Sequence, residues 1–267
     1  MLKKLLKIFY ARKKVGLVLG GGVARGLAHI GALKVFERQG LKVDYVAGTS
    51  SGALIGALYA AGISAFEMEK IALKMGWDKI VQVSLSVHGP FSSLPLIRFI
   101  ERRIGKIDFE KLKMPLAIVA TDLRNGEEVI IQKGSVAEAV AASSAFPGFF
   151  RPIQIGKHDL LVDGGVVNNL PVDVVKRMGA DIVIAIDVVP IKAPLSSLHL
   201  DMVKILGRSI DLMLKQLSEK NRQQADFLIE PKIAEDVWHL DLKHAKQLIY
   251  EGEFAAQRIM PEIISAI

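Results

Sequence analysis

The sequence predicts a three-layer α/β/α fold around a mostly parallel central sheet. Strand-like and helix-like segments alternate along the chain, and such alternation produces right-handed crossovers between parallel strands. Residues 180–189, ADIVIAIDVV, form a continuous apolar run, which is typical of a central strand buried on both faces. The 267 residues are 51% hydrophobic and show no repeat or linker. We therefore expect one domain over residues 15–267, preceded by a basic amphipathic segment over residues 1–14.

The amino-terminal part is expected to hold two strand–helix pairs. Residues 14–21 are an apolar run that ends in glycines, and residues 24–40 have the pattern of a helix. A second short strand is expected at 42–48 and a second helix at 51–62. Residues 45–66 carry no formal charge over 22 positions, which is long enough to cross a bilayer. The glycines and serines among them instead indicate a turn between a buried strand and a buried helix.

The remaining elements continue the alternation. Further strands are expected at 115–123, 127–134, 159–165 and 225–231. A helix is expected to begin at Ser135, where Glu138 completes a capping box. A long amphipathic helix is expected at 198–224, and the tail from Asp241 is also helical in pattern. The most loop-like regions are 82–95 and 190–199.

The formal net charge of +7 is concentrated at the amino terminus. Six basic residues and no acidic residue lie within the first 14, which leaves about +1 on the remainder. The six are Lys3, Lys4, Lys7, Arg12, Lys13 and Lys14. A domain that binds phosphate backbones should carry a basic face of its own, so we expect no nucleic acid among the partners.

Residues 1–14 have the pattern of a short interfacial helix, with four apolar residues at helical spacing: Leu2, Leu5, Leu6 and Phe9. A helix of ten residues reaches only ~15 Å, too short to span a bilayer, but it can lie on an anionic surface. Two alternatives stay open. One is a signal peptide with its apolar region at 15–24, although no A-x-A-like cleavage site follows. The other is a helix that docks on the domain or frays. We expect a cytoplasmic protein with peripheral contact with the inner membrane surface.

Cysteine is absent, which excludes disulfides and thiolate metal sites and is compatible with a reducing compartment. The six histidines contain no HExxH pair. They are His29, His88, His158, His199, His239 and His244. We therefore expect neither a metal nor another cofactor.

Residues 48–52, GTSSG, fit the pattern G-x-S-x-G. Between a strand and a helix, this pattern indicates a nucleophile elbow, which exposes the serine hydroxyl beside the positive N-terminus of the helix. Ser50 is then the nucleophile and Ser51 begins the helix. A serine that simply caps a helix would look similar.

Residues 19–31, LGGGVARGLAHIG, predict a second glycine-rich turn, whose backbone N–H groups can bind an anion. The dinucleotide pattern G-x-G-x-x-G fails at Arg25, and no G-x-x-x-x-G-K-[ST] is present. The other use of such N–H groups is an oxyanion hole, which requires a nucleophile nearby. Ser50 follows the next strand.

A serine nucleophile also needs a base. His239 and His244 lie in or beside helical segments and look like surface residues. Asp163 ends an apolar strand and is pinned by the glycine turn 164–165, so it is well placed to accept the proton of Ser50. The plainer interpretation of Asp163 is a turn or capping residue.

In this order, GGGVARG, GTSSG and DGG resemble the patatin-like phospholipase family, and ASSAFPGFFRP at 142–152 is similar to the family's segment before the aspartate. The resemblance runs from about Val15 to Asp187. It implies a patatin-like fold and a serine acyl hydrolase of the lipase/phospholipase type. Such an enzyme cleaves lipid acyl esters through an acyl-enzyme with a Ser–Asp dyad, without histidine or metal.

By match to these motifs, Ser50 is expected to be the nucleophile and Asp163 the base. The oxyanion hole is expected at Gly21, Gly22, Val23 and Arg25. The motif glycines are Gly20, Gly26, Gly48, Gly52, Gly164 and Gly165. Many family members have glycine where this chain has Val23, and a β-branched residue is costly at positive φ. We therefore expect an ordinary φ at Val23, or a slightly different oxyanion turn.

The dyad has two physical requirements. Burial must raise the pKa of Asp163, because a solvated aspartate with a pKa of ~3.9 is a weak base. The acyl chain needs an apolar trough, for which the candidates, unless they are simply core, are Leu85, Val87, Phe91, Phe146, Phe149 and Phe150. Two other functions stay open: a soluble carboxylesterase or thioesterase on the same dyad, and a membrane-associated regulator with little turnover.

Overall fold

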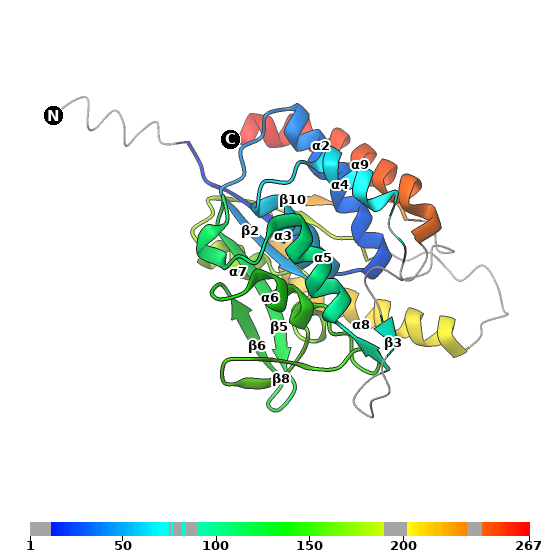
Figure 1. Ribbon diagram of the computed structural model, residues 1–267. Helices are drawn as coiled ribbons and strands as arrows, with labels where there is room; N and C mark the ends of the chain where they lie inside the picture. The colour runs from blue at the N-terminus through cyan, green and yellow to red at the C-terminus, as the bar shows by residue number, and fades with distance from the viewer. Residues whose placement is uncertain (1–11, 75, 77–81, 84–89, 190–201, 234–241) are drawn as a thin grey trace.

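A central sheet of eight strands organises the molecule (Figure 1). The structure is a computed structural model, and it describes residues 12–74, 76, 82–83, 90–189, 202–233 and 242–267. The strands of the sheet are β1 (Val15–Leu19), β2 (Tyr45–Thr49), β5 (Leu116–Asp122), β6 (Glu127–Ile131), β7 (Ile153–Ile155), β8 (His158–Asp163), β9 (Ile182–Ile186) and β10 (Phe227–Ile229). A separate two-stranded sheet pairs β3 (Gln82–Val83) with β4 (Phe91–Ser92).

Helices cover both faces of this sheet. The α-helices are α2 (Leu27–Arg38), α3 (Ser51–Ala60), α4 (Ala65–Ala72), α5 (Leu94–Ile104), α6 (Val136–Ser143), α7 (Val172–Arg177), α8 (Met202–Gln224) and α9 (Ala245–Ala266). Short 3-10 helices are η1 (Val23–Gly26), η3 (Phe109–Lys111), η4 (Gly164–Val166) and η5 (Leu242–His244). The predicted α/β class is confirmed. The sequence patterns missed α4, α5, α7 and β7. The expectation of a loop over residues 82–95 is wrong in part, because β3, β4 and the start of α5 lie there. The other expected loop, 190–199, lies outside the described residues.

The sheet is parallel along five strands, in the order β10-β9-β1-β2-β5, and antiparallel beyond them. Both β6 and β8 run antiparallel to β5, and β7 runs antiparallel to β8. The uncharged segment 45–66 contains β2 and α3, which are both largely buried. In the described part of the chain, no helix has the length and apolar character that a membrane span requires.

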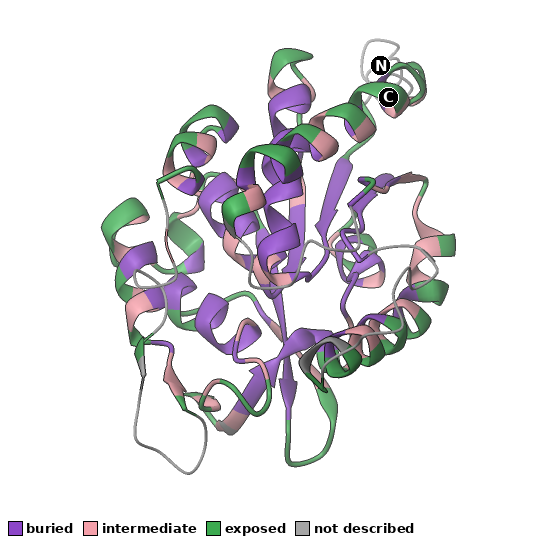
Figure 2. Cartoon of the chain, turned by 90° about the vertical axis from the view of Figure 1, so that its right-hand side faces the viewer, coloured by how far each residue is buried: buried purple, intermediate pink, exposed green. Residues whose placement is uncertain are grey.

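The core lies on both sides of β1, as expected of a central strand. Leu17 and Leu19 belong to the larger apolar cluster with α2, α3 and α9, whereas Val18 belongs to the cluster with α7. Figure 2 shows this buried centre enclosed by helices with exposed outer sides. Helices α2 and α9 cross at two glycines, Gly31 and Gly252. A Cβ at Gly252 would lie 1.8 Å from the carbonyl oxygen of Ala28. Only glycine permits that approach, which fixes α9 to the fold.

The register of β5 brings two chain segments together end to end. Thr49, the last residue of β2, pairs with Val119 of β5. Asp163, the last residue of β8, pairs with the next residue of β5, Ala120. Since β2 is parallel and β8 antiparallel to β5, the carboxyl ends of β2 and β8 point toward each other. The residues that follow β2 therefore meet the end of β8.

Candidate active site

Ser50 occupies a strained turn between β2 and α3. Its backbone has φ 54° and ψ −121°, and Ser50 and Val23 are the non-glycine residues with positive φ among those that the structure describes. Backbone strain of this kind costs about 1–3 kcal/mol and concentrates at functional sites. The turn packs closely against β1, since a Cβ at Gly52 would lie 2.0 Å from the carbonyl oxygen of Leu19. The strand–turn–helix geometry is that of a nucleophile elbow.

The side chains of Ser50 and Asp163 are in direct contact. The Ser50 hydroxyl donates a hydrogen bond of 2.7 Å to Oδ2 of Asp163. Both residues are buried, with relative exposures of 8% and 4%. The structure thus brings together two expected site residues that lie 113 positions apart in the sequence.

Asp163 is held by hydrogen bonds to both its carboxylate and its backbone. Its second carboxylate oxygen, Oδ1, accepts a 2.8 Å hydrogen bond from the N–H of Gly165. Its own N–H donates to the carbonyl of Ala145, and its carbonyl accepts from the hydroxyl of Thr121. Burial raises the pKa of Asp163 to about 6, against the opposing effect of the bonds from Ser50 and Gly165. A carboxyl group of this pKa is largely ionised at neutral pH and is a stronger base than a solvated aspartate.

Ser143 is a site residue that sequence reasoning missed. Its fully buried hydroxyl accepts a 2.8 Å hydrogen bond from the N–H of Ser50 and donates a 2.6 Å bond to the carbonyl of Val119. It therefore connects the elbow to β5 and satisfies the polar backbone of the strained residue. The available signal was a serine pair inside the apolar stretch AVAASSAF, where a buried hydroxyl needs a partner.

The glycine-rich turn after β1 lies against Ser50. A Cβ at Gly21 would be 3.2 Å from the Cβ of Ser50 and 2.4 Å from Oδ1 of Asn169. The N–H of Gly21 donates to the carbonyl of Asn169, and the N–H of Gly22 donates to the hydroxyl of Ser51. Two of the expected oxyanion donors are therefore engaged within the protein. Asn169, whose side chain donates to the carbonyl of Gly21, was also missed from the sequence.

Of the two alternatives expected for Val23, an ordinary φ is wrong, and a slightly different oxyanion turn stays a prediction. Val23 opens η1 with φ 52°, in the left-handed region that favours glycine. The turn is thus held in the conformation that glycine would adopt without strain, despite its β-branched side chain.

Replacing Val23 with glycine is therefore expected to raise the free energy of unfolding by up to about 1 kcal/mol. Relief of a left-handed conformation is worth about 1–2 kcal/mol, and glycine returns about 0.5–1 kcal/mol through the unfolded state. Urea unfolding followed by circular dichroism measures the change. Val166→Gly, at an exposed valine without positive φ, is the matched control and should lose stability. An equal loss in the two variants would contradict the strain argument.

Two further polar residues, Arg25 and His29, hold this turn in place through buried contacts. The guanidinium of Arg25 is buried and makes a 2.7 Å ion pair with Asp211 of α8, so it faces that helix. The Nε2–H of His29 donates a 2.8 Å hydrogen bond to the carbonyl of Gly20. Burial lowers the pKa of His29 to about 4, so the ring is neutral at physiological pH. His29 thus has a structural position under the turn that the sequence did not reveal.

Aromatic side chains gather beside Asp163. Phe146 directly follows Ala145, whose carbonyl accepts the N–H of Asp163, and its ring meets that of Phe149 at 5.7 Å between centroids. Phe91 packs against Phe149 and Phe150 at 6.5 and 5.9 Å. Phe149 remains 37% exposed. Four of the six trough candidates thus form one partly exposed cluster, and the other two, Leu85 and Val87, lie outside the described residues.

The remaining motif residues lie where the patterns put them. Gly20 follows β1, Gly26 ends η1, and Gly48 precedes the elbow within β2. Gly164 and Gly165 open η4 directly after Asp163. His244 lies in η5, where its Nδ1 is 3.2 Å from Oε1 of Gln247, and His239 lies outside the described residues.

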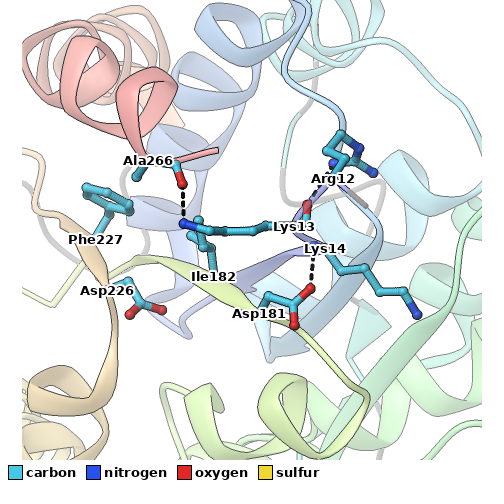
Figure 3. A pocket seen from close by; sticks show the side chains of 8 residues that line it. All are labelled: Arg12, Lys13, Lys14, Asp181, Ile182, Asp226, Phe227 and Ala266. Atoms are coloured by element: carbon cyan, nitrogen blue, oxygen red, sulfur yellow. Dashed lines mark hydrogen bonds between the residues drawn. The ribbon is translucent and has the colours of Figure 1, made fainter. Parts of the chain in front are cut away.

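A cavity of about 720 Å³ lies at the other end of the parallel strands from Ser50 (Figure 3). It is lined by Arg12, Lys13, Lys14, Asp181, Ile182, Asp226, Phe227 and Ala266. Apart from Ala266, which ends α9, these residues lie at the amino ends of β1, β9 and β10, whereas ligands of open α/β sheets bind at the carboxyl ends. The polar groups there bind one another: Lys13 donates to the carbonyl of Ala266, and the N–H of Lys14 donates to Asp181. These contacts hold Lys13 and Lys14 on the domain.

Comparison with solved structures supports the fold. The chain superimposes on VipD from Legionella pneumophila with a TM-score of 0.55 and 14% identity, over 94% of this chain and 67% of that one. It superimposes on ExoU, in its complex with SpcU from Pseudomonas aeruginosa, with a TM-score of 0.51 and 15% identity, over 94% and 51%. At this level of identity, the likeness concerns the fold alone.

Comparison of sequences shows the family. The mouse protein "Patatin-like phospholipase domain-containing protein 6" is 39% identical to this chain over 183 residues, which are 65% of this chain and 13% of the mouse protein. An uncharacterised NTE family protein of Mycobacterium tuberculosis is 33% identical over 65% of this chain and 48% of its own length. "Lysophospholipase nte1" of Aspergillus fumigatus is 35% identical over 66% of this chain and 12% of its own length. The chain thus spans between about an eighth and a half of these relatives. The family model for patatin-like phospholipases matches residues 17–176, and the chain belongs to this family.

Proposed function

We propose that this protein is a serine acyl hydrolase that cleaves acyl esters of lipids with Ser50 as nucleophile and Asp163 as base. The observation that carries the proposal is the 2.7 Å hydrogen bond between the two buried side chains at the elbow. Membership of the patatin-like phospholipase family supports a hydrolase, and a hydroxyl bound to a carboxylate of raised pKa supports this assignment of roles.

The proposed reaction has two half-steps that conserve protons. In the first, the Ser50 hydroxyl transfers its proton to Oδ2 of Asp163 while Oγ attacks the ester carbonyl. The tetrahedral intermediate collapses to an acyl-enzyme, and the leaving alcohol takes the proton from Asp163. In the second, Asp163 accepts a proton from water, which attacks the acyl-enzyme, and the proton returns to Ser50 as the fatty acid leaves.

The intermediate needs N–H donors for its negative oxygen. We assign the N–H of Val23, in the glycine-rich turn, and the N–H of Ser51, which follows the nucleophile. Gly21 and Gly22 shape this turn, since their N–H groups are bound to Asn169 and Ser51. The strained φ of Val23 supports a functional role for this peptide group.

A lipid panel tests the proposed function. Wild-type protein and Ser50→Ala are incubated with phospholipids, lysophospholipids, acyl-CoA thioesters and short-chain esters, and products are identified by mass spectrometry. Lysophospholipids come first, because one relative is named for that activity. Release of fatty acid from lipids by the wild type alone supports the proposal. Turnover of short-chain esters or thioesters only would favour the soluble esterase, and no turnover at all would favour the regulator.

Residues 1–11 are proposed to bring the enzyme to anionic surfaces. Residues 12–14 are tied to the domain, through Arg12 to Asp44, Lys13 to Ala266 and Lys14 to Asp181. Deletion of residues 1–11 spares these contacts and removes three lysines. Each basic residue near an anionic surface contributes about 1 kcal/mol, so we expect binding to anionic vesicles to weaken by at least about tenfold at low salt.

Vesicle co-sedimentation at low and high salt measures this effect. Hydrolysis of a soluble short-chain ester should stay unchanged, because Ser50 and Asp163 lie outside the deleted segment. Equal, salt-insensitive binding by the two forms would contradict the surface role. A parallel loss of thermal stability and of both activities would indicate a helix docked on the domain.

A further inference from the structure

Helix α8 has its polar and apolar sides reversed relative to an ordinary surface helix. Surface helices normally bury an apolar stripe and expose polar side chains. The side of α8 that faces the domain is instead largely polar: Asp211, Lys215, Ser218, Asn221 and Arg222. Its opposite side exposes six large apolar residues, each half-exposed or more. They are Met202, Ile205, Leu206, Leu212, Met213 and Leu217, and we call them the α8 stripe.

The inner side of α8 is held firmly by ionic contacts. Lys215 and Arg222 both pair with Asp187, which is buried at the end of β9. The amide of Asn221 donates to the carbonyl of Leu170 at 3.0 Å. These contacts fix the rotation of the helix, so its apolar side chains point away from the domain. Six large apolar side chains exposed on one side of a helix exceed the scattered ones of an ordinary surface, and such an excess marks an interaction surface.

The same helix touches both turns of the proposed active site. Asp211 pairs with Arg25, which lies in the turn after β1. Leu214 approaches the glycine turn after Asp163: a Cβ at Gly165 would lie 3.4 Å from its Cδ2. The next residue of that turn, Val166, is 44% exposed. The α8 stripe therefore lies directly outside the site, separated from it by the thickness of one helix.

The exposed charge of α8 favours an anionic lipid surface over a neutral partner. Lys215 and Arg222 lie on the inner side, where both pair with Asp187. The acidic residues of the helix, Asp211 and Glu219, form ion pairs with Arg25 and Arg222. Lys220 is exposed one turn beyond Leu217. An exposed apolar side with a basic residue beside it is the pattern of a helix that lies in a lipid interface.

We propose that the α8 stripe docks on the lipid surface that contains the substrate. An interfacial helix sinks ~5–10 Å into the boundary between headgroups and acyl chains, and a helix is ~10–12 Å across. Residues immediately behind α8 are then brought to the level of that boundary, where the acyl-ester bonds of lipids lie. The choice of lipid as occupant rests on the proposed function, and the inference adds the surface and the orientation.

The test separates binding from catalysis. Binding is measured on full-length protein carrying Ser50→Ala, by co-sedimentation with phosphatidylcholine vesicles that contain about a third phosphatidylglycerol. The stripe variant is L206Q/M213Q/L217Q. The matched control is Y250Q/F254Q, which removes two exposed aromatic residues of α9, 62% and 46% exposed, on the opposite face of the sheet (Figure 1).

We expect the stripe variant to lower the partition coefficient by at least about tenfold and the control variant to leave it unchanged. The loss should persist at high salt, because it removes apolar contact, whereas loss through residues 1–11 is electrostatic. With Ser50 restored, the stripe variant should hydrolyse a soluble short-chain ester at the wild-type rate and act more slowly on vesicles.

Several results would overturn the inference. They are unchanged partitioning by the stripe variant, an equal loss in the α9 control, or loss of soluble-ester hydrolysis in the stripe variant. Sedimentation velocity tests whether a second copy of the chain binds the α8 stripe. A wild-type dimer that the stripe variant converts to a monomer would make the stripe a subunit interface instead. Stripe-dependent binding without turnover of any ester would refute the proposed function and leave the docking surface supported.

Discussion

Replacing Ser50 with alanine is expected to lower kcat for ester hydrolysis by at least about a thousandfold. The substitution removes the attacking oxygen, and loss of a nucleophile from a coupled dyad costs orders of magnitude. It also removes the 2.7 Å hydrogen bond to Asp163 without adding volume, so the fold should persist. Steady-state hydrolysis of a short-chain ester and circular dichroism measure the two effects.

A fluorophosphonate probe distinguishes the two serines of the elbow. Wild-type protein should be labelled at Ser50, and Ser50→Ala should not be labelled. Ser51→Ala is the matched control: its hydroxyl accepts the N–H of Gly22, so its loss should disturb the turn and lower the rate without abolishing labelling. An adduct on Ser51, or substantial turnover by Ser50→Ala, would refute the assignment.

The main elements of the fold could be predicted because their patterns are local. Strands β1, β2, β5 and β9 are apolar runs next to glycine turns, and the elbow and the DGG turn are short motifs with fixed residue types. The expected helix at Ser135 has its cap, in which the serine side chain accepts the N–H of Glu138. Helix α7 was missed because six residues are too few for a clear period, and α5 because it follows a loop-like stretch.

The site itself required information that is not local. The contact between Ser50 and Asp163 depends on β2 and β8 meeting beside β5, and strand pairing over such distances leaves no mark in the sequence. Ser143, Asn169 and His29 are ordinary residue types, and only their burial against backbone groups reveals their roles. The structure has a positive φ at Val23 where an ordinary φ was expected, because local sterics oppose a positive φ and tertiary contacts impose it.

Replacing Asp163 with asparagine is expected to abolish activity nearly completely and to stabilise the protein at neutral pH. The amide is nearly isosteric and can still accept the N–H of Gly165, but it cannot accept the proton of Ser50. The stability gain follows from burial, which raises the pKa of Asp163 from 3.8 to about 6. The folded state therefore binds this proton more tightly than the unfolded state does. Its contribution to stability is complete below pH ~4 and is lost as the pH rises through about 6.

Asparagine carries no charge to bury, so the variant should gain roughly 1–3 kcal/mol in the free energy of unfolding at pH 7. The gain should vanish near pH ~3, which lies below both pKa values, so that Asp163 is protonated in both states of the wild type. Urea unfolding at the two pH values measures it. For the wild type, log kcat/KM for a soluble ester should rise with unit slope below pH ~6 and level off above it, as the carboxylate ionises. His244→Ala is the control and should keep most of the activity and the same profile. If His244→Ala were inactive instead, or if Asp163→Asn lost stability at pH 7 and retained turnover, Asp163 would be a structural turn residue and the base would lie elsewhere.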